Sequence, residues 1–413
     1  MVPATDRLGR DIDLSDPAQH AKHDLGAFWR QLRHEAPVAW HPLGQEPGGF
    51  WVVSTHRAAI EVYRDSDRFT SRHGNVLATL LNGGDSAGGL MLAVSDGPRH
   101  QEIRRELLRS FSHSALAPIR ERTTAAVRSL VRRAVAAGTC DFASEVAARI
   151  PLAAICDLLE VPEERRDFLY SQASKALAAD APFATDEDAR LARNEILLLF
   201  AQIVRGRRST PSEDTVLGSL LRLTGPPLRL TTEELLFNCY SLLLGGDETT
   251  RLTMIGTVRE FAADPVLWHR LRDGEVSVGT AVDELLRWTT PAMHGGRTAT
   301  QDTVLEGRRI AAGDLVVVWN NSANFDEAQF TEPDRLDLGR TPNRHLAFAH
   351  GPHYCLGVAL AKIELTALLE ALVEQVDDIT LTGEPKRIYS NFLSGYHSLP
   401  VRLTARAEVR RGP

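Results

Sequence analysis

Hydrophobic side chains recur every three to four residues along most of the chain, the spacing that places them on one face of an α-helix. This spacing predicts helices over 28–33, 57–64, 98–110, 117–137, 151–159, 163–179, 186–205 and 214–223. Short strand-like segments are predicted over 50–54, 303–305, 309–310, 315–319, 379–381 and 400–403. The predicted fold class is therefore mainly α with a small β subdomain, whose β-rich segments lie near 38–54, 297–320 and 379–405.

The most apolar helical pattern begins at Thr231 or Thr232, either of which can act as an N-cap before the acidic residues that follow. Gly245 and Gly246 lie in the middle of this pattern. Each glycine costs roughly 1 kcal/mol relative to alanine inside a helix. Two interpretations follow from the residues alone: one long helix contains the glycines for a functional reason, or two helices meet here and Asp247 caps the second.

The chain shows no internal repeat and no long linker, so residues 1–413 are predicted to form one domain. With 43% hydrophobic residues it can bury a large core. A net charge of -7 with interspersed signs argues against nucleic-acid binding. The polar segment 1–15 has no apolar run that could serve as a signal peptide or membrane anchor, so we expect a cytoplasmic protein with no membrane partner.

Four cysteines, Cys140, Cys156, Cys239 and Cys355, are widely spaced and form no disulfide or zinc pattern. Only Cys355 lies in a turn rich in glycine and proline, with the sequence FAHGPHYCLG, directly before a helical pattern. A helix N-terminus favours a thiolate. A thiolate there could ligate heme iron, with room for a flat ligand beside glycines. A lone cysteine is more often simply buried, but here the spacing Phe-x-x-Gly-x-x-x-Cys-x-Gly is satisfied in full.

On this segment, and on the Gly-Gly-x-acid-Thr and Glu-x-x-Arg segments described below, the chain resembles the cytochrome P450 family of heme-thiolate monooxygenases. The resemblance extends along nearly the whole chain. It implies the cytochrome P450 fold, heme b (iron protoporphyrin IX) with Cys355 as its axial iron ligand, and O2 as co-substrate. Electrons would come from NAD(P)H through a separate ferredoxin and ferredoxin reductase, because the chain has no flavin- or nicotinamide-binding fingerprint.

The resemblance favours one long helix around the two glycines, because the family's central helix carries Gly-Gly-x-acid-Thr at this place. It implies that Thr249 hydrogen-bonds the bound oxygen and that Glu248 helps to deliver protons. Two protons are needed to cleave the O–O bond, which suits an adjacent hydroxyl and carboxylate. Asp247 is expected to be a solvated or substrate-proximal carboxylate rather than the relay itself.

A second motif, Glu284-Leu-Leu-Arg287, would by itself be a common surface ion pair. The resemblance implies instead a buried structural pair, with Arg335 as the predicted third member of its network. Two positions depart from the family pattern, since Ala349 replaces a common glycine and Phe325 a common arginine.

Heme carries two propionates, which need cationic partners in an apolar pocket. The residues implied to bind the cofactor are His100, Arg104, Arg297, Ala347, Phe348, Gly351, His353, Cys355 and Gly357. Of these, His100, Arg104, Arg297 and His353 are the expected propionate partners. Each alone would more often be an ordinary surface charge.

The family's variable substrate contacts map to segments 80–94, 173–185, 242–246, 292–296 and 391–395. The predicted contact residues in these segments are Met91, Leu242, Gly245, Ala292, Met293, His294 and Leu393. His294 alone would more often be a wall residue than a substrate-binding group. The glycine-rich stretch before Met91 suggests a mobile lid.

The predicted function is insertion of one oxygen atom from O2 into a small organic substrate, a secondary-metabolite intermediate such as those of antibiotic biosynthesis, free or bound to a carrier protein. Alternatives within the enzyme class are oxidative coupling, epoxidation, nitration and peroxide-driven chemistry. The alternative of another class is a non-catalytic heme sensor or carrier, which would have no need for the Glu248–Thr249 relay.

A basic patch is expected on the thiolate side of the protein. Its predicted members are Arg99, Arg105, Arg109, Arg344 and Lys362, which lie near the proximal motifs in sequence. Such a patch would attract an acidic ferredoxin.

Overall fold

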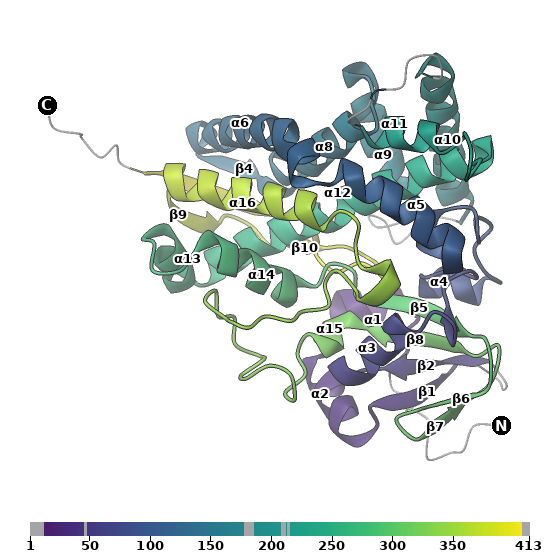
Figure 1. Cartoon of the computed structure of the whole chain (residues 1–413). Helices are drawn as coiled ribbons and strands as arrows, with labels where there is room; N and C mark the ends of the chain where they lie inside the picture. Colours follow the sequence, from purple (N-terminus) through teal and green to yellow (C-terminus); the bar gives the residue numbers. More distant parts are fainter. Residues whose placement is uncertain (1–11, 45–47, 177–185, 208–211, 213–214, 407–413) are drawn as a thin grey trace, which may run out of the picture.

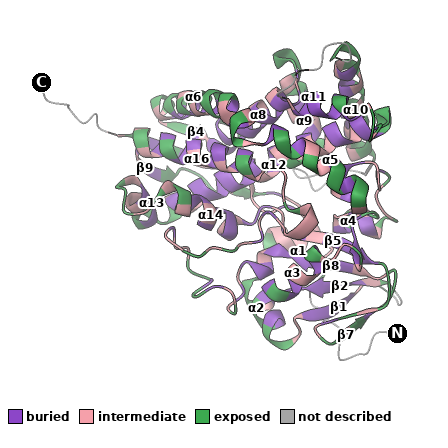
Figure 2. Ribbon diagram, viewed as in Figure 1, coloured by how far each residue is buried: buried purple, intermediate pink, exposed green. Residues whose placement is uncertain are grey.

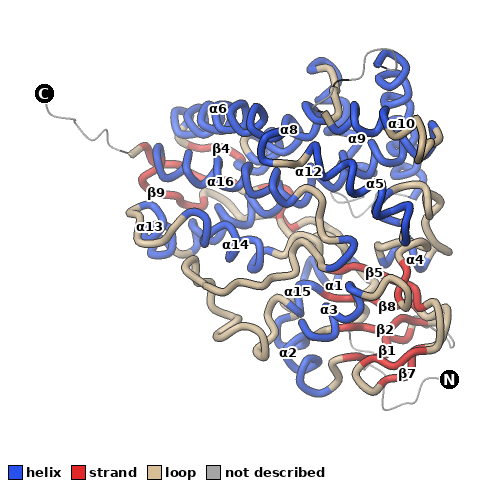
Figure 3. The backbone as a smooth tube through the Cα atoms, in the orientation of Figure 1, coloured by secondary structure: helices blue, strands red, loops and turns tan. Residues whose placement is uncertain are grey.

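The computed structural model describes residues 12–44, 48–176, 186–207, 212 and 215–406 (Figure 1). Part of one predicted substrate segment, 177–185, lies outside the described residues. Helices dominate one end of the molecule and strands gather mainly at the other (Figure 3). The prediction of a mainly α fold with a small β subdomain is therefore confirmed.

The α-helices of the described chain are α1 Pro17–Lys22, α2 Gly26–Glu35, α3 His56–Arg64, α4 Leu77–Leu81, α5 Gly97–Ser110, α6 His113–Ala137, α7 Phe142–Glu145, α8 Ile150–Leu158, α9 Arg166–Ala176, α10 Asp186–Arg207, α11 Val216–Arg222, α12 Thr232–Ala263, α13 Pro265–Arg272, α14 Val278–Thr289, α15 Asn320–Ala323 and α16 Val358–Gln375. Short 3-10 helices include η2 Leu92–Val94 and η5 Gly351–His353. None of these helices is both long and apolar enough to cross a lipid bilayer.

The strands are β1 Val38–Pro42, β2 Gly49–Val53, β3 Phe69–Thr70, β4 Thr139–Asp141, β5 His294–Ala299, β6 Thr303–Leu305, β7 Arg308–Ile310, β8 Leu315–Trp319, β9 Val376–Leu381, β10 Lys386–Arg387, β11 Tyr396–Ser398 and β12 Pro400–Ala405. The main sheet has the order β1-β2-β8-β5-β3. β2 runs parallel to β8, whereas β5 runs antiparallel to β8 and pairs His294 with Trp319. A smaller sheet has the order β4-β12-β9.

The main sheet is apolar on both faces because helices cover both. Phe50 and Val52 point to the side where Trp29 and Leu32 of α2 pack. The residues that alternate with them, including Trp51, point to the opposite side, against α3. Figure 1 shows α1, α2, α3 and α15 gathered around this sheet. The sheet therefore forms a rigid base from which β5 projects its side chains toward the helical part.

The longest helix, α12, continues through Gly245 and Gly246 for 32 residues. The interpretation that two helices meet at these glycines is therefore wrong. Thr231 caps the helix in a reciprocal capping box with Glu234. Contacts with α8, α10, α13, α14 and α16 surround α12, and many of its residues are buried (Figure 2).

Gly245 and Gly246 of α12 differ in what surrounds them. A Cβ at Gly246 would lie 2.9 Å from Cγ1 of Ile155 on α8, so glycine lets the two helices pack closely. A Cβ at Gly245 would meet no protein atom within 4 Å. Of these two residues, only Gly246 is therefore held as glycine by packing against the rest of the protein.

We predict that Gly246→Ala lowers the free energy of unfolding by about 1–2 kcal/mol, because overpacking costs roughly 1–3 kcal/mol and the gain in helix propensity returns up to about 1 kcal/mol. Gly245→Ala is the matched control, and it should leave stability unchanged or slightly raised. Urea unfolding of both variants measures the difference. Equal effects of the two substitutions would contradict this account of the α8–α12 contact.

Candidate functional site

Most of the predicted site residues meet in one cavity between α12, α5, β5 and the loop that leads into α16. The predicted residues that line it are His100, Arg104, Leu242, Gly245, Thr249, Ala292, His294, Arg297, Ala347, Phe348, His353, Cys355 and Gly357. Segments far apart in the sequence thus contribute to a single enclosed space, as an active site requires.

Five predicted residues lie outside the cavity wall. Met91 packs against Ala87 and Val94, Met293 lies in the core beneath the main sheet, and Leu393 packs against Leu252. Gly351 and Glu248 are also absent from the wall. Met91, Met293 and Leu393 therefore shape the cavity only through the backbone segments that they anchor.

Cys355 is fixed by backbone contacts at the turn before α16. Its N–H donates to the Phe348 carbonyl over 3.0 Å, and Gly357 is the N-cap of α16. The residue is partly exposed, on the cavity that it lines. Burial nevertheless raises the pKa of the Cys355 thiol, and the Gly357 N–H and the Arg104 charge only partly oppose this. Burial of the sulfur therefore opposes the preference for a thiolate that the helix end gives.

Gly351 is required by packing rather than by the space beside the sulfur. Its φ is +71°, and an added Cβ would lie 3.0 Å from the Cα of Arg64 and closer still to the Tyr63 carbonyl. We expected Gly351 to make room for a ligand beside the sulfur. Instead, it allows η5 to pack closely against α3. Ala349 adopts a left-handed φ of 55°, which is costly for a residue other than glycine.

Two arginines line the cavity, and Arg297 is buried whereas Arg104 is half-buried. Arg297 donates to the Gly296 carbonyl and lies over the Tyr63 ring. Arg104 donates to the Tyr354 carbonyl. Among the described residues, neither arginine forms an ion pair. A buried guanidinium without a carboxylate is costly, so this wall fits an anionic ligand.

Two histidines adjoin these arginines. The rings of His100 and His353 lie 4.4 Å apart, and His353 contacts the carboxylate of Asp96 at 2.8 Å. Nε2 of His100 is buried without a partner among the described residues. Burial, together with the neighbouring charges of His353 and Arg104, lowers the pKa of His100 to about 4. The thiol, the unpaired cations and the orphaned imidazole nitrogen together fit heme with its two propionates.

The relay residues lie on different sides of α12. Thr249 lines the cavity, and its hydroxyl donates to the Gly245 carbonyl over 3.3 Å. Glu248 is buried, forms an ion pair with Arg251 and accepts a hydrogen bond from Ser174 over 3.3 Å. The structure therefore brings Thr249, but not the Glu248 carboxylate, to the cavity wall.

Two buried carboxyl groups, those of Asp247 and Glu364, lie near the cavity. Asp247 is fully buried and is absent from the cavity wall, so the expectation of a solvated or substrate-proximal group is wrong. Glu364 on α16 is fully buried but lines the cavity. None of their carboxylate oxygens has a partner among the described residues. Burial raises the pKa of both groups, with a second contribution from Glu248 for Asp247 and from Asp247 for Glu364.

Sequence reasoning missed Glu364. The signal was a single charged residue on the apolar face of the predicted helix, where the neighbouring Ile363 and Leu365 are buried. A carboxyl at such a position must be protonated or solvated by ordered water.

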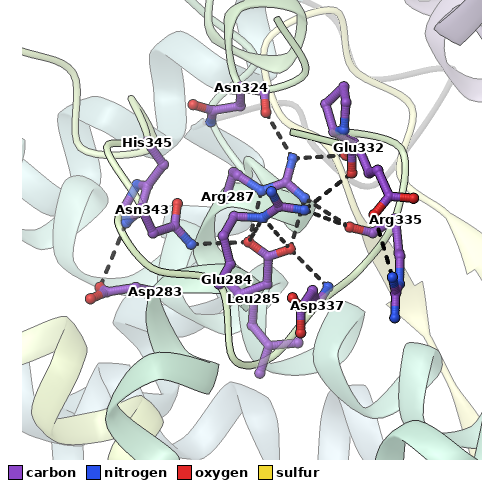
Figure 4. A network of polar contacts seen from close by, with 12 residues as sticks. Asp283, Glu284, Leu285, Arg287, Asn324, Glu332, Arg335, Asp337, Asn343 and His345 are labelled. Carbon is purple, nitrogen blue, oxygen red and sulfur yellow. Dashed lines mark hydrogen bonds and ion pairs between the residues drawn. The ribbon is translucent and has the colours of Figure 1, made fainter. Parts of the chain in front are cut away.

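The Glu-x-x-Arg pair lies at the centre of a buried network (Figure 4). Arg287 donates to both carboxylate oxygens of Glu284 over 2.8 Å. Its remaining N–H groups reach main-chain carbonyls, including those of Asn324 and Pro333. The pair therefore ties α14 to the loop that leads toward Cys355.

The third member of this network is Arg340, and the prediction of Arg335 is wrong. Nε of Arg340 lies 3.1 and 3.0 Å from the two oxygens of Glu284. Arg335 contributes only its main-chain carbonyl, while its exposed side chain contacts Glu332. Arg340 follows the turn at Asp337, which brings its side chain back toward α14.

The raised pKa of Asp247 gives a testable pH dependence. Between the usual carboxyl pKa of about 4 and the raised value, the native state holds a proton that the unfolded state has released. Stability from this group is therefore lost as pH rises through that window. We predict that Asp247→Asn, which cannot ionise, makes the free energy of unfolding depend less on pH between pH 5 and 8.

Asp65→Asn is the control for this experiment, because hydrogen bonds from Arg68 outweigh burial and lower the pKa of Asp65. Its effect should be confined to more acidic pH. Denaturant unfolding at several pH values measures both slopes. The account of the buried carboxyl is wrong if Asp247→Asn and the unsubstituted protein show the same slope.

Comparison with known proteins agrees with this geometry. Residues 278–402 match the family model described as Cytochrome P450. The chain is 46% identical to Cytochrome P450 NovI of Streptomyces niveus, over 95% of this chain and 96% of that protein. It is 31% identical to linalool 8-monooxygenase of Pseudomonas putida, over 95% of this chain and 98% of that protein.

Solved structures show the same fold. The crystal structure of P450 OxyD, described as involved in the biosynthesis of vancomycin-type antibiotics, has a TM-score of 0.86 and 37% identity, over 96% of this chain and 100% of that one. CYP108D1 from Novosphingobium aromaticivorans has a TM-score of 0.85 and 31% identity, over 95% of this chain and 97% of that one. The chain therefore belongs to the cytochrome P450 family and is a heme-dependent monooxygenase.

Proposed function

We propose that this monooxygenase inserts one oxygen atom from O2 into a small organic intermediate of secondary metabolism, in the cytoplasm, with electrons from a ferredoxin and its reductase. The observation that carries the proposal is the cavity in which Cys355, the buried Arg297 without a carboxylate partner and the unpaired Nε2 of His100 accompany the Thr249 hydroxyl. Support for the substrate class comes from OxyD, which is involved in the biosynthesis of vancomycin-type antibiotics. The similarity to NovI supports the assignment to the P450 family.

The cofactor would be held by residues from three elements. Cys355 would supply the sulfur ligand of the iron. Arg104 of α5 and Arg297 of β5 would neutralise the propionates, and His100 of α5 and His353 of η5 would hydrogen-bond to them. Ala347, Phe348 and Gly357 would lie against the heme as part of the cavity wall. When bound, the heme supplies the redox chemistry of dioxygen activation, with electrons from NAD(P)H delivered by redox partner proteins.

The protein's own part in the reaction is to exclude water and to move protons. Insertion of one oxygen atom with reduction of the other to water consumes two protons and two electrons. Thr249 can hold a proton at Oγ1 on the cavity wall. Delivery from Glu248 requires that its buried ion pair with Arg251 opens, because the carboxylate lies off the wall.

Ferredoxin docking is proposed on the face around Tyr354, next to the Cys355 turn. Of the predicted basic patch, Arg105 and Arg344 are exposed. Leu108 and Tyr354 are large side chains exposed by 44% and 41%, and they would add apolar contacts to such an interface. Arg99, Arg109 and Lys362 already pair with Glu234, Glu106 and Asp283, respectively. An acidic partner is attracted to such a face, and salt screens that attraction.

Product yield per NAD(P)H tests the proposed relay. Thr249→Ala should keep heme binding and substrate affinity but divert electrons to hydrogen peroxide. Glu248→Gln should slow the oxygen-dependent step, since proton transfer is typically worth roughly 100- to 10,000-fold. The measurement uses a compound that shifts the heme spectrum in a binding screen, with NAD(P)H, product and peroxide all quantified.

Thr257→Ala is the matched control, because Thr257 is a buried threonine of α12 outside the cavity wall. It should leave coupling unchanged. Coupling that is equally unchanged in Thr249→Ala and Glu248→Gln would rule out the relay. Absence of any turnover in the unsubstituted protein would instead favour the non-catalytic alternative.

A further inference from the structure

One wall of the cavity is a segment with little interior of its own. Residues 75–94 contain α4, a glycine-rich turn and η2, and Asn75, Leu92 and Ala93 line the cavity. Within the turn, Gly83, Gly84 and Gly89 have positive φ values. Apolar packing inside the segment is limited to a small cluster. Its position therefore depends on attachments to the rest of the protein.

The first attachment is His294 on β5. Its Nε2 accepts the N–H of Leu77, the first residue of α4, over 2.9 Å. The preceding residue, Val76, provides no side-chain cap, so the distant imidazole takes that role. The ring also packs against Phe392 and Trp319, with centroid distances of 5.2 and 5.0 Å. One side chain thus joins α4, the main sheet and the 391–395 loop.

The second attachment is Asn238 on α12. Its Oδ1 accepts the N–H of Leu92, the first residue of η2, over 2.9 Å. Its Nδ2 donates to the carbonyls of Glu234 and Leu90, over 2.7 and 3.3 Å. η2 likewise has no side-chain cap from Met91. Asn238 is fully buried, so its amide cannot exchange these partners for solvent.

His294 can act as an acceptor only when it is neutral. Burial, with a smaller effect from His20, lowers the pKa of His294 to about 3. The imidazole proton is therefore on Nδ1. That nitrogen lies against the Asn391 backbone but makes no hydrogen bond of normal geometry among the described residues. The attachment to Leu77 thus persists throughout the neutral pH range.

We propose that His294 and Asn238 are positioning residues that cap α4 and η2 from a distance and so hold residues 75–94 over the cavity. Each fixes one end of the segment, and each leaves a buried N–H unpaired if its acceptor is removed. Together they determine how large a compound the cavity retains. The inference rests on the proposed function only for the chemical class of the substrate in the cavity.

Backbone amide exchange of the heme-loaded protein tests the two attachments separately. His294→Phe keeps a ring against Phe392 and Trp319 but removes the acceptor. It should speed exchange in peptides containing Leu77 by roughly two- to tenfold, the effect of one lost hydrogen bond, with little change at Leu92. Asn238→Leu should do the reverse. Peptides from α16 provide the internal reference.

His294→Gln is the rescue variant, because its Oε1 can reach the position of Nε2. It should restore slow exchange at Leu77. Release of 4-phenylimidazole from the heme should be at least twofold faster in His294→Phe and Asn238→Leu, whereas release of imidazole, which is smaller, should be unchanged. Binding of both probes is followed by the Soret shift, so no substrate is needed.

Exchange at Leu77 and Leu92 that matches the unsubstituted protein in both acceptor-free variants would overturn the proposal. Failure of His294→Gln to restore protection would also overturn the capping role of His294 and would assign its effect to packing. If His294→Phe does not bind heme, His294→Gln and Asn238→Leu still decide the question. A failed proposed function appears instead in the assay of product per NAD(P)H, and the exchange result stands independently of it.

Discussion

The site depends on arginines without carboxylate partners in the same cavity as a cysteine sulfur. Arg297, which is buried, and Arg104, which is half-buried, form no ion pair among the described residues, and burial raises the pKa of Cys355. A buried charge without a partner is costly, so Arg297 in particular calls for a ligand that brings negative charge, and ionisation of the sulfur calls for a cation. Heme meets both requirements at once, through its propionates and its iron. The two arginines come from α5 and β5, which both line the cavity.

The position of the charges is set by two rigid supports. The main sheet carries Arg297 and His294 on β5, and the Glu284–Arg287–Arg340 network holds the loop that leads to Cys355. Between these supports α12 supplies one wall of the cavity. Successive residues on a helix point about 100° apart, so Thr249 faces the cavity while Glu248 turns toward Arg251. In the proposed relay, delivery of a proton from Glu248 would require this buried ion pair to open.

Periodicity and family resemblance together predicted the fold class, the single long helix and many of the residues that line the cavity. They did not predict features that depend on the course of a turn or on tertiary contacts of a side chain. Arg335 and Arg340 follow Glu284 at similar separations, and only the turn at Asp337 decides which guanidinium reaches the carboxylate. Gly351 was interpreted through its distance in sequence from Cys355, whereas its neighbour in space is α3. A carboxyl group such as that of Asp247 or Glu364 is usually exposed to solvent. Only the packing of α12 and α16 shows that both groups are buried.

The central claim is that Cys355 ligates the heme iron. The most direct test is the absorption spectrum of the reduced, carbon monoxide-bound protein, compared with Cys355→Ser and with Cys140→Ser, a buried cysteine of β4 outside the cavity. The account predicts the strongly red-shifted Soret band of a thiolate-ligated heme in the unsubstituted protein and in Cys140→Ser, and its loss in Cys355→Ser. A histidine-type spectrum in the unsubstituted protein, or an unchanged band in Cys355→Ser, would contradict it.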